Sequence, residues 1–306
     1  MKTKYGIISD IHRTVPTSIQ FAIYAFKEMG VKKLIFNGDI IGSVNNISEQ
    51  DYLAYLLGHT GDIGMETYVQ PGSHEKVSDF EPVIKAFQTR YSNIIYTVEN
   101  PKLETKDHHI VFLPGSDWAP NDAAGQGYHF GLGKKTGFYR TNTGITRMTN
   151  IEDLRKLITE PERTIVICHV PRKFDKPDSA VDTAYFGEAT TDFSLKNSPI
   201  DMGSVFPGPI GEQLVQAGFP VIMKKENRGN EDLRTIYEDL GVRKSVSGHF
   251  HESAHRANDR NGNHVAEGEL QNELFWNASY ADEGRFGILT VDDCKASYEN
   301  INFNKK

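Results

Sequence analysis

Short hydrophobic runs alternate along this chain with segments whose apolar residues recur at helical spacing. The run Tyr5–Ser9 has the composition of a buried strand, and residues 16–29 then carry apolar side chains three and four positions apart, as on one helix face. Gly30 stands where glycine often ends a helix, and residues 33–37 form a second apolar run. This strand–helix–strand order predicts parallel strands in a layered α/β fold.

The alternation continues along the rest of the chain, without internal repeats or low-complexity tracts. We predict further helices near residues 49–57, 79–91, 151–158, 210–217 and 231–240. We predict further strands near residues 66–69, 109–113, 164–168, 244–247, 273–277 and 285–291. Strands that alternate with helices in this way are typical of sheets with helices packed on their faces.

Two stretches interrupt this alternation. Residues 116–149 are rich in glycine, asparagine and aromatics, and residues 171–209 are rich in proline, aspartate, serine and threonine with little helical period. Both follow predicted strand ends, where α/β sheets bind ligands, so we expect them to form the rim of a site. In the first stretch Lys134, Lys135 and Arg140 are candidate substrate-binding residues. The alternative is that both stretches are surface insertions without a role.

Composition narrows the class of protein. The chain has 306 residues, enough for one large domain or two ordinary ones. Its 38% hydrophobic and 25% charged residues are ordinary for a soluble globular protein. The net charge of −7 argues against a protein that coats nucleic acid, because such proteins are more often basic.

The cysteines and the N-terminal segment bear on location. Cys168 and Cys294 are the only cysteines, so no disulfide framework is expected, and Cys168 lies inside an apolar run that suits a core residue. Residues 1–4 lead into a strand without a signal-peptide core, and no stretch approaches the ~20 apolar residues of a membrane helix. We therefore expect a cytoplasmic protein with no membrane partner.

The chemistry is indicated by short polar motifs, each directly after a predicted strand. The motifs are Asp10-Ile11-His12, Gly38-Asp39, Gly72-Ser73-His74-Glu75, His169 and Gly248-His249-Phe250-His251. Each is weak alone, since Asp and Gly-Asp are common in turns and a histidine after a strand is often structural. Together they predict carboxylate and imidazole ligands for two divalent cations that share one carboxylate. Such a pair can hold a phosphate and produce hydroxide at neutral pH.

This ordered set of motifs resembles the calcineurin-like metallophosphoesterases, which carry Asp-x-His, Gly-Asp, Gly-Asn-His-Glu/Asp, a single His and Gly-His-x-His. The resemblance covers residues 5 to about 251 and implies one domain over residues 1–306, a four-layer α/β/β/α sandwich of two mixed sheets. It implies a first metal held by Asp10, His12 and His251, a second held by His169 and His249, and Asp39 as the bridge. It also implies that His74 acts beside the metals, as general acid or phosphate contact.

Two departures from the family pattern refine this interpretation. Ser73 replaces the family's asparagine, so the second metal has a shorter and weaker oxygen ligand, a water held by Ser73, or a looser site. Asp39 is followed by Ile40 rather than by the Gly-Asp-x-x-Asp-Arg-Gly pattern of phosphoprotein phosphatases, so that subtype is not expected.

We therefore expect hydrolysis of a phosphomonoester or phosphodiester by a hydroxide held between the two cations, with His74 donating a proton to the leaving group. Oxygen and nitrogen ligands suit Mn²⁺, Fe²⁺, Zn²⁺ or Co²⁺. The expected partner is a small phosphoester or a nucleotide-like substrate. The alternatives are a nuclease of the same superfamily, disfavoured by the negative net charge, and a non-catalytic binding protein that keeps the fold, which Ser73 makes conceivable.

Overall fold

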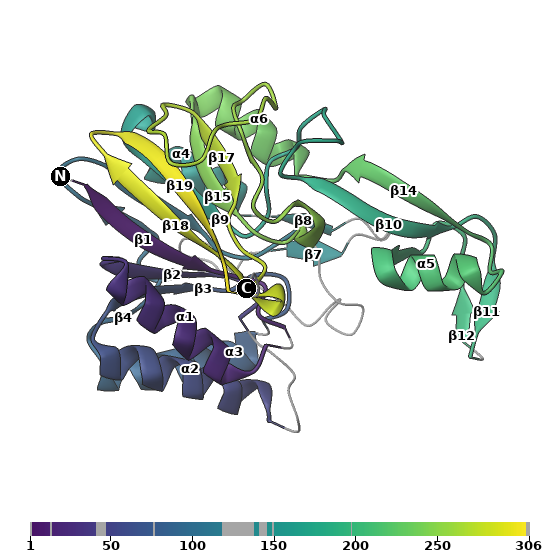
Figure 1. The fold of residues 1–306 in the computed structure, drawn as a ribbon, viewed down its shortest axis with the longest axis horizontal. Helices are drawn as coiled ribbons and strands as arrows, with labels where there is room; N and C mark the ends of the chain where they lie inside the picture. Colours follow the sequence, from purple (N-terminus) through teal and green to yellow (C-terminus); the bar gives the residue numbers. More distant parts are fainter. Residues whose placement is uncertain are drawn as a thin grey trace.

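Two six-stranded mixed sheets pack face to face in the computed structural model (Figure 1). The residues described are 2–12, 14–40, 47–75, 77–117, 138–140, 146–148, 150–196 and 198–303.

The first sheet has the strand order β19-β18-β1-β2-β3-β4. Strands β1 to β4 are parallel to one another, whereas β18 is antiparallel to both β1 and β19. The bounds are β1 Thr3–Ile8, β2 Lys33–Asn37, β3 Glu66–Gln70, β4 Ile94–Tyr96, β18 Arg285–Asp292 and β19 Lys295–Asn302.

The second sheet has the order β16-β17-β15-β9-β6-β5, with the four central strands parallel and the two edge strands antiparallel to their neighbours. The bounds are β5 Lys102–Glu104, β6 His109–Leu113, β9 Thr164–Cys168, β15 Lys244–Ser247, β16 Ala257–Asn258 and β17 Leu274–Asn277. The predicted strands 109–113, 164–168 and 244–247 agree with the structure in both bounds.

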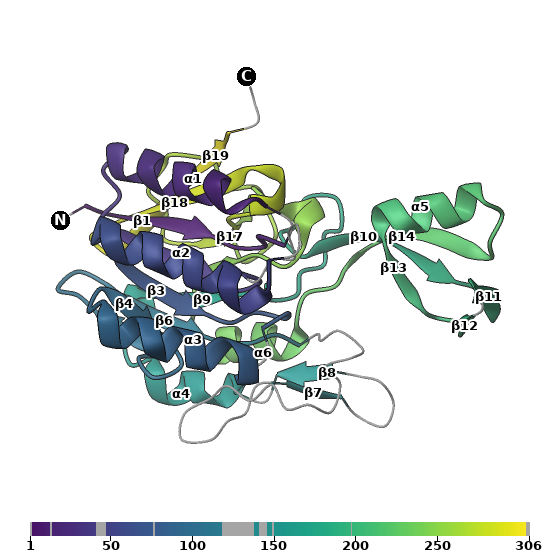
Figure 2. The same cartoon turned by 90° about the horizontal axis from the view of Figure 1, so that it is seen from below.

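Helices cover the outer face of each sheet, which completes the predicted four-layer sandwich (Figure 2). Over the first sheet lie α1 Pro16–Glu28, α2 Glu49–Ile63 and α3 Val77–Arg90. Over the second lie α4 Leu154–Leu157 and α6 Glu231–Leu240, and short 3-10 turns occur at Ile151–Asp153, Pro161–Arg163, His251–Ser253 and Ala281–Glu283. None of the helices within the described ranges has the length and apolar character needed to cross a membrane.

Strand β9 shows how the sequence builds these layers. Because successive side chains of a strand point to opposite faces, Ile165 and Ile167 enter the core between the two sheets. Val166 and Cys168 enter the core under α4 and α6 instead. A strand buried on both faces must be apolar throughout, which explains the continuous hydrophobic run. Cys168 is thus a core residue, as predicted.

A lobe projects from one end of the sandwich (Figures 1 and 2). It contains a sheet of order β13-β10-β14, the hairpin β11-β12 and helix α5. The bounds are β10 Thr183–Ala189, β11 Phe193–Leu195, β12 Ser198–Ile200, β13 Val205–Pro207, α5 Gly208–Gln216 and β14 Val221–Asn227. The expectation of an irregular segment over 171–209 is therefore wrong for residues 183–207. Three of these strands have only three residues, too few to show a period of two. In the other predicted insertion, strands β7 Phe138–Arg140 and β8 Thr146–Met148 pair in antiparallel fashion.

Candidate metal centre

The predicted ligands meet because the strands that precede them are parallel within each sheet and end at the same side of the sandwich. Asp10 and His12 follow β1, Asp39 follows β2, Ser73 and His74 follow β3, His169 follows β9, and His249 and His251 follow β15. The seven aspartates and histidines among them form three overlapping groups, and within each group the ligand atoms lie within 4.8 Å of one another.

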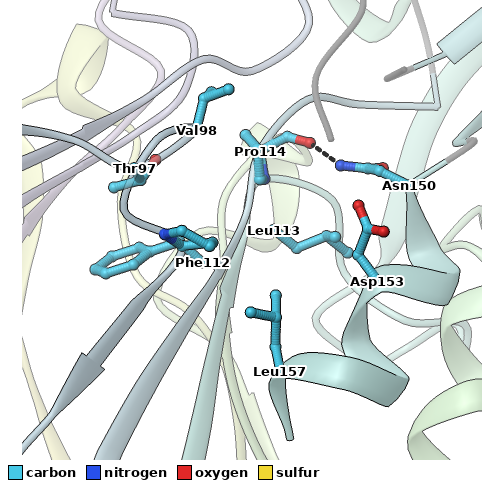
Figure 3. A pocket seen from close by; sticks show the side chains of 9 residues that line it. Thr97, Val98, Phe112, Leu113, Pro114, Asn150, Asp153 and Leu157 are labelled. Carbon is cyan, nitrogen blue, oxygen red and sulfur yellow. Dashed lines mark hydrogen bonds between the residues drawn. The ribbon is translucent and has the colours of Figure 1, made fainter. Parts of the chain in front are cut away.

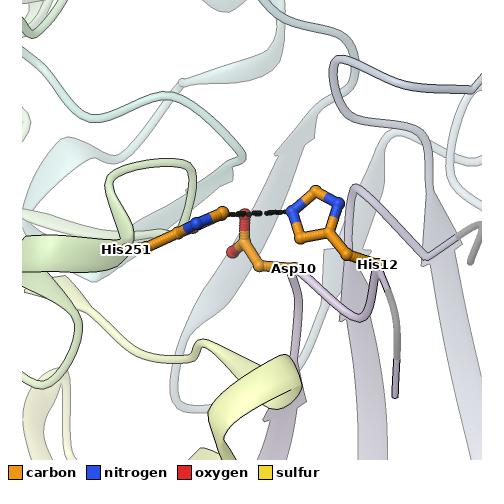
Figure 4. A group of neighbouring side chains, drawn as sticks. All are labelled: Asp10, His12 and His251. Carbon is orange, nitrogen blue, oxygen red and sulfur yellow. Dashed lines mark hydrogen bonds and ion pairs between the residues drawn. The ribbon is translucent and has the colours of Figure 1, made fainter. Parts of the chain in front are cut away.

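Asp10, His12 and His251 form the first group (Figure 4). The Nε2 atoms of the two histidines are 3.1 Å apart, about the separation of two ligands on one ion with bonds of roughly 2.1 Å. Asp10 Oδ1 lies 3.3 Å from His251 Nε2 and 3.9 Å from His12 Nε2. The other oxygen, Oδ2, accepts a hydrogen bond of 2.6 Å from Ser9 Oγ, which turns Oδ1 toward the histidines.

Asp39, His169 and His249 form a second group. His169 is fully buried, and its Nδ1 lies 2.8 Å from the Asn37 carbonyl oxygen. A carbonyl only accepts, so Nδ1 carries a proton and Nε2 is the nitrogen that could coordinate a cation. That Nε2 is buried without a hydrogen-bond partner and lies 3.2 Å from Asp39 Oδ2. A buried imidazole nitrogen beside a carboxylate oxygen is the arrangement that a cation completes.

His12, Asp39 and His74 form the third group and join the other two. Asp39 Oδ2 is 3.2 Å from His169 Nε2, 3.8 Å from His74 Nε2 and 4.0 Å from His12 Nε2. One carboxylate oxygen therefore faces ligands of both predicted metals. Asp39 thus belongs to two of the three groups, with Oδ2 turned toward histidines of both.

Ser73 hydrogen bonds to the Asp39 carboxylate and contacts both of its oxygens. The main-chain N–H of Ser73 donates to Asp39 Oδ1 at 2.6 Å. The main-chain N–H of His74 donates to the same oxygen at 3.0 Å. Ser73 is 1% exposed, and its hydroxyl lies 2.9 Å from Oδ1 and 2.7 Å from Oδ2. The structure therefore places Ser73 as a hydrogen-bond donor to the Asp39 carboxylate.

Backbone conformation sets the direction of several ligands. Asp10, His12, Asp39 and His249 have φ of 55°, 43°, 50° and 70°, in the left-handed region that non-glycine residues seldom adopt. Such residues gather where the surrounding structure fixes them for a function. A chain leaving a strand in this conformation turns sharply and directs the side chain back across the strand ends.

Glycine allows two loops to approach the carboxylates closely. A Cβ on Gly72 would lie 2.6 Å from Asp39 Oδ1, and a Cβ on Gly248 would overlap Asp10 Oδ2 and lie 2.5 Å from Ser9 Oγ. The glycines of the Gly72-Ser73 and Gly248-His249 motifs are thus required by space around the acids.

Charge pairing perturbs the titration of these groups. Burial alone would raise the pKa of Asp10, but His169 and His251 outweigh it and lower that pKa to about 2. The pKa of Asp39 also lies well below its usual range, because His169 and His74 offset burial. Burial lowers the pKa of His249 to about 3, helped by the charge of His169. Two ionised acids and a neutral imidazole are the protonation states that metal ligation requires.

His169 shows the strength of the negative field. Burial would lower its pKa, but the charges of Asp39 and Asp10 outweigh burial and raise it to about 10. A proton on His169 Nε2 and a divalent cation would each offset the negative charge of Asp39 and Asp10. The residues therefore fit a metal ion by donor type, burial and charge, and these His/Asp groups could hold one or more cations.

Three residues around the ligands were not assigned from sequence. Ser9 holds Asp10, the Asn37 carbonyl orients His169, and the Glu75 carboxylate accepts three main-chain N–H groups beside Asp39. Glu75 belongs to the motif Gly72-Ser73-His74-Glu75, so the sequence contained a signal that it lies near the site. Ser9 acts on the adjacent Asp10, a contact for which the sequence carries no motif, and Asn37 acts on the distant His169 through its main-chain carbonyl, which residue type does not reveal.

The predicted substrate contacts are not tested. Lys134 and Lys135 lie outside the described residues, and Arg140 ends β7, for which only the backbone course is described.

A small pocket, separate from the candidate ligands, lies between the end of β6 and the α4 region (Figure 3). It is lined by Thr97, Val98, Pro101, Phe112, Leu113, Pro114, Asn150, Asp153 and Leu157.

Comparison with known proteins finds solved structures that resemble this chain in fold. No described protein family matches the sequence, and no curated protein matches it. The solved structure of TT1561 of Thermus thermophilus aligns with a TM-score of 0.53 at 7% identity, over 98% of this chain and 99% of that chain. Another solved structure aligns with a TM-score of 0.51 at 13% identity over the same shares. At such identities the likeness concerns the fold alone.

Proposed function

We propose that this protein is a metal-dependent phosphoester hydrolase of the calcineurin-like metallophosphoesterase superfamily. One observation carries the proposal: Asp39 Oδ2 faces His169, His74 and His12 at 3.2, 3.8 and 4.0 Å. A single carboxylate oxygen between two sets of imidazoles suits a pair of cations better than one. Support also comes from the sandwich fold and from the order of the motifs along the chain.

In this proposal Asp10, His12 and His251 hold one cation, His169 and His249 hold the other, and Asp39 serves both. Two bound cations would neutralise the charge of a phosphate group and acidify water, which makes phosphoester hydrolysis the reaction class. Mn²⁺, Fe²⁺, Zn²⁺ and Co²⁺ all suit these donors.

The role proposed for His74 is proton donation to the leaving oxygen of the substrate. Its side chain is 38% exposed, so it can meet a substrate, whereas the neighbouring Asp39 side chain is 3% exposed. Its Nε2 lies 3.8 Å from Asp39 Oδ2, at the edge of the ligand groups. An imidazole in this place can protonate a departing alkoxide, a contribution of about 10²–10⁴-fold.

The proposed substrate is a small phosphoester or a nucleotide-like molecule, and the proposed location is the cytoplasm. The test is hydrolysis of p-nitrophenyl phosphate, bis(p-nitrophenyl) phosphate, cyclic nucleotides and single-stranded DNA, with Mn²⁺, Fe²⁺, Zn²⁺ or Co²⁺ and after chelation. We expect metal-dependent turnover of a monoester or diester. Asp39→Asn should abolish it, whereas His264→Ala, at an exposed position, should not. Turnover that survives exhaustive chelation would refute the metal mechanism, and preference for DNA would indicate the nuclease.

A further inference from the structure

Glu75 is a fully buried acid whose two carboxylate oxygens accept main-chain N–H groups from two different loops. Its Oε2 accepts from Asp39 N at 3.1 Å and from Gly72 N at 2.6 Å. Its Oε1 accepts from Ile40 N at 2.5 Å. One side chain thus ties the loop after β2 to the loop after β3.

Two of these N–H groups lie on either side of the Asp39 Cα. Asp39 has φ of 50°, and a left-handed residue can turn successive N–H groups toward one anion. By accepting both the Asp39 and Ile40 N–H groups, Glu75 constrains φ and ψ of Asp39 together. The left-handed backbone conformation of Asp39 is strained, and the Glu75 carboxylate stabilises it.

The same four-residue loop also holds the Asp39 side chain. Ser73 and the His74 N–H donate to Oδ1, while Glu75 holds the main chain of Asp39. Backbone and side chain are fixed by successive residues of one loop. The oxygen that faces both sets of imidazoles is Oδ2.

We propose that Glu75 is a positioning residue, which fixes Asp39 in the left-handed conformation that presents Oδ2 to both cations. This rests on the proposed function, since it assumes that Asp39 binds metal. Glu75 is not itself a ligand: it belongs to none of the three ligand groups found among the described residues. Its action reaches the cations only through Asp39.

Glutamine is the sharpest substitution at this position, because it has the shape of glutamate but only one accepting terminal atom. In Glu75→Gln at least one of the Asp39, Ile40 and Gly72 N–H groups loses its acceptor. Glu75→Asp keeps both oxygens but is one methylene shorter, so with the two loops held where they are it reaches fewer of the three N–H groups. Both variants loosen Asp39 while every predicted ligand stays in the chain.

Asp182 provides a matched control. It is also a fully buried acid that accepts main-chain N–H groups, from Phe174 at 2.9 Å and Gly229 at 3.2 Å, and it belongs to no ligand group among the described residues. Asp182→Asn therefore reports the general cost of disturbing a buried carboxylate. A purely structural role for Glu75 would make its variants behave like this one.

The experiment is a Co²⁺ titration of the full-length protein after chelation, followed by visible absorption and without substrate. We expect Glu75→Gln and Glu75→Asp to bind Co²⁺ about 10- to 100-fold more weakly, with altered absorption bands. Asp182→Asn should keep the affinity and spectrum of the unmodified protein. Thermal unfolding monitors all three variants, and we expect each to fold with a lowered Tm.

The outcomes separate this proposal from the proposed function. Weakened Co²⁺ binding in the Glu75 variants supports positioning even if no phosphoester is hydrolysed. Unchanged affinity and spectrum in folded Glu75 variants, or an equal loss in Asp182→Asn, overturns it while leaving the hydrolase proposal intact. Failure of both Glu75 variants to fold also overturns it, since Glu75 would then hold the fold. An unmodified protein that binds no Co²⁺ overturns both.

Discussion

At the level of single residues, each aspartate of the candidate metal centre accepts a hydrogen bond from a serine and turns one oxygen toward histidines, Oδ1 in Asp10 and Oδ2 in Asp39. Ser9 Oγ donates to Asp10 Oδ2, and Ser73 donates to Asp39. The carboxylates are therefore oriented by the protein, so less rotational freedom has to be lost when a cation binds. The hydroxyl of Ser73 thus places a short hydrogen-bond donor beside the Asp39 carboxylate.

His74→Ala tests the proton donor. We expect turnover of alkyl phosphoesters to fall about 10²-fold or more, because an alkoxide needs a proton to leave. Nitrophenyl esters should lose little, since nitrophenolate leaves without one. Metal content should stay at the unmodified level, measured by elemental analysis beside His264→Ala. An equal loss for both ester types would point to phosphate positioning instead.

Gly248→Ala tests the close packing around Asp10. A methyl group there would overlap Asp10 Oδ2, so the carboxylate must move. We expect about 1–3 kcal/mol of lost unfolding free energy and about 10-fold weaker metal binding. Gly58→Ala in α2 is the matched control, because its Cβ would make ordinary contact at 3.5 Å with Phe87. Calorimetric metal titration and thermal unfolding measure both effects, and a Gly248→Ala protein with unchanged affinity would contradict the geometry.

At the level of elements, the candidate site takes residues from both sheets, so it depends on how the two sheets pack. His108, just before β6, is 1% exposed and hydrogen bonds through Nε2 to Tyr5 Oη of β1 at 2.6 Å. Its Nδ1 lies 3.1 Å from the hydroxyl of Thr105. This pair joins the two sheets at the interface between them. It makes the sandwich sensitive to protonation of His108.

Burial lowers the pKa of His108 from 6.5 to about 4, so the folded state favours the neutral ring. The stabilisation is complete above pH 6.5 and is lost as the pH falls toward 4, because the unfolded chain takes up the proton first. We expect this residue to account for about 2 kcal/mol of that loss, allowing for solvent screening. Urea unfolding of His108→Gln should show a flatter pH dependence between 6.5 and 4 than the unmodified protein. Parallel curves would contradict the assignment.

At the level of the whole molecule, cation binding should stabilise the fold, since the ligands come from both sheets and meet only when the sheets pack. At 100 times the dissociation constant, a bound ion adds about 2.7 kcal/mol, or about 5 °C in Tm for a chain of this size. Scanning calorimetry with and without Mn²⁺ measures this shift. Asp39→Asn should lose most of it, whereas Asp182→Asn should keep it. A shift that survives Asp39→Asn would place the stabilising ion elsewhere.

The parts of the molecule that carry local signals could be predicted from sequence alone. Apolar runs predicted β6 and β9 in both bounds, and the helical period predicted α6 as residues 231–240. The bounds of β15 were also predicted, although its sequence is Lys-Ser-Val-Ser. The motifs at strand ends predicted Asp10, His12, Asp39, His74, His169, His249 and His251, which the structure brings together. These succeed because parallel strands must end at one side of their sheet, so residue type and position after a strand suffice to place a side chain.

Features that depend on partners distant in sequence are set only when the chain folds. Strand β14 pairs with β10 in the projecting lobe, and β19 completes the first sheet against β18. The half-exposed side chains of β14 and the short strands beside it carry little periodic signal. Likewise, the hydrogen bonds that join Ser73 and Glu75 to Asp39 connect residues 34 to 36 positions apart in the sequence. Which oxygen of a carboxylate faces the histidines follows from such hydrogen bonds, and these exist only once the loops after β2 and β3 lie side by side.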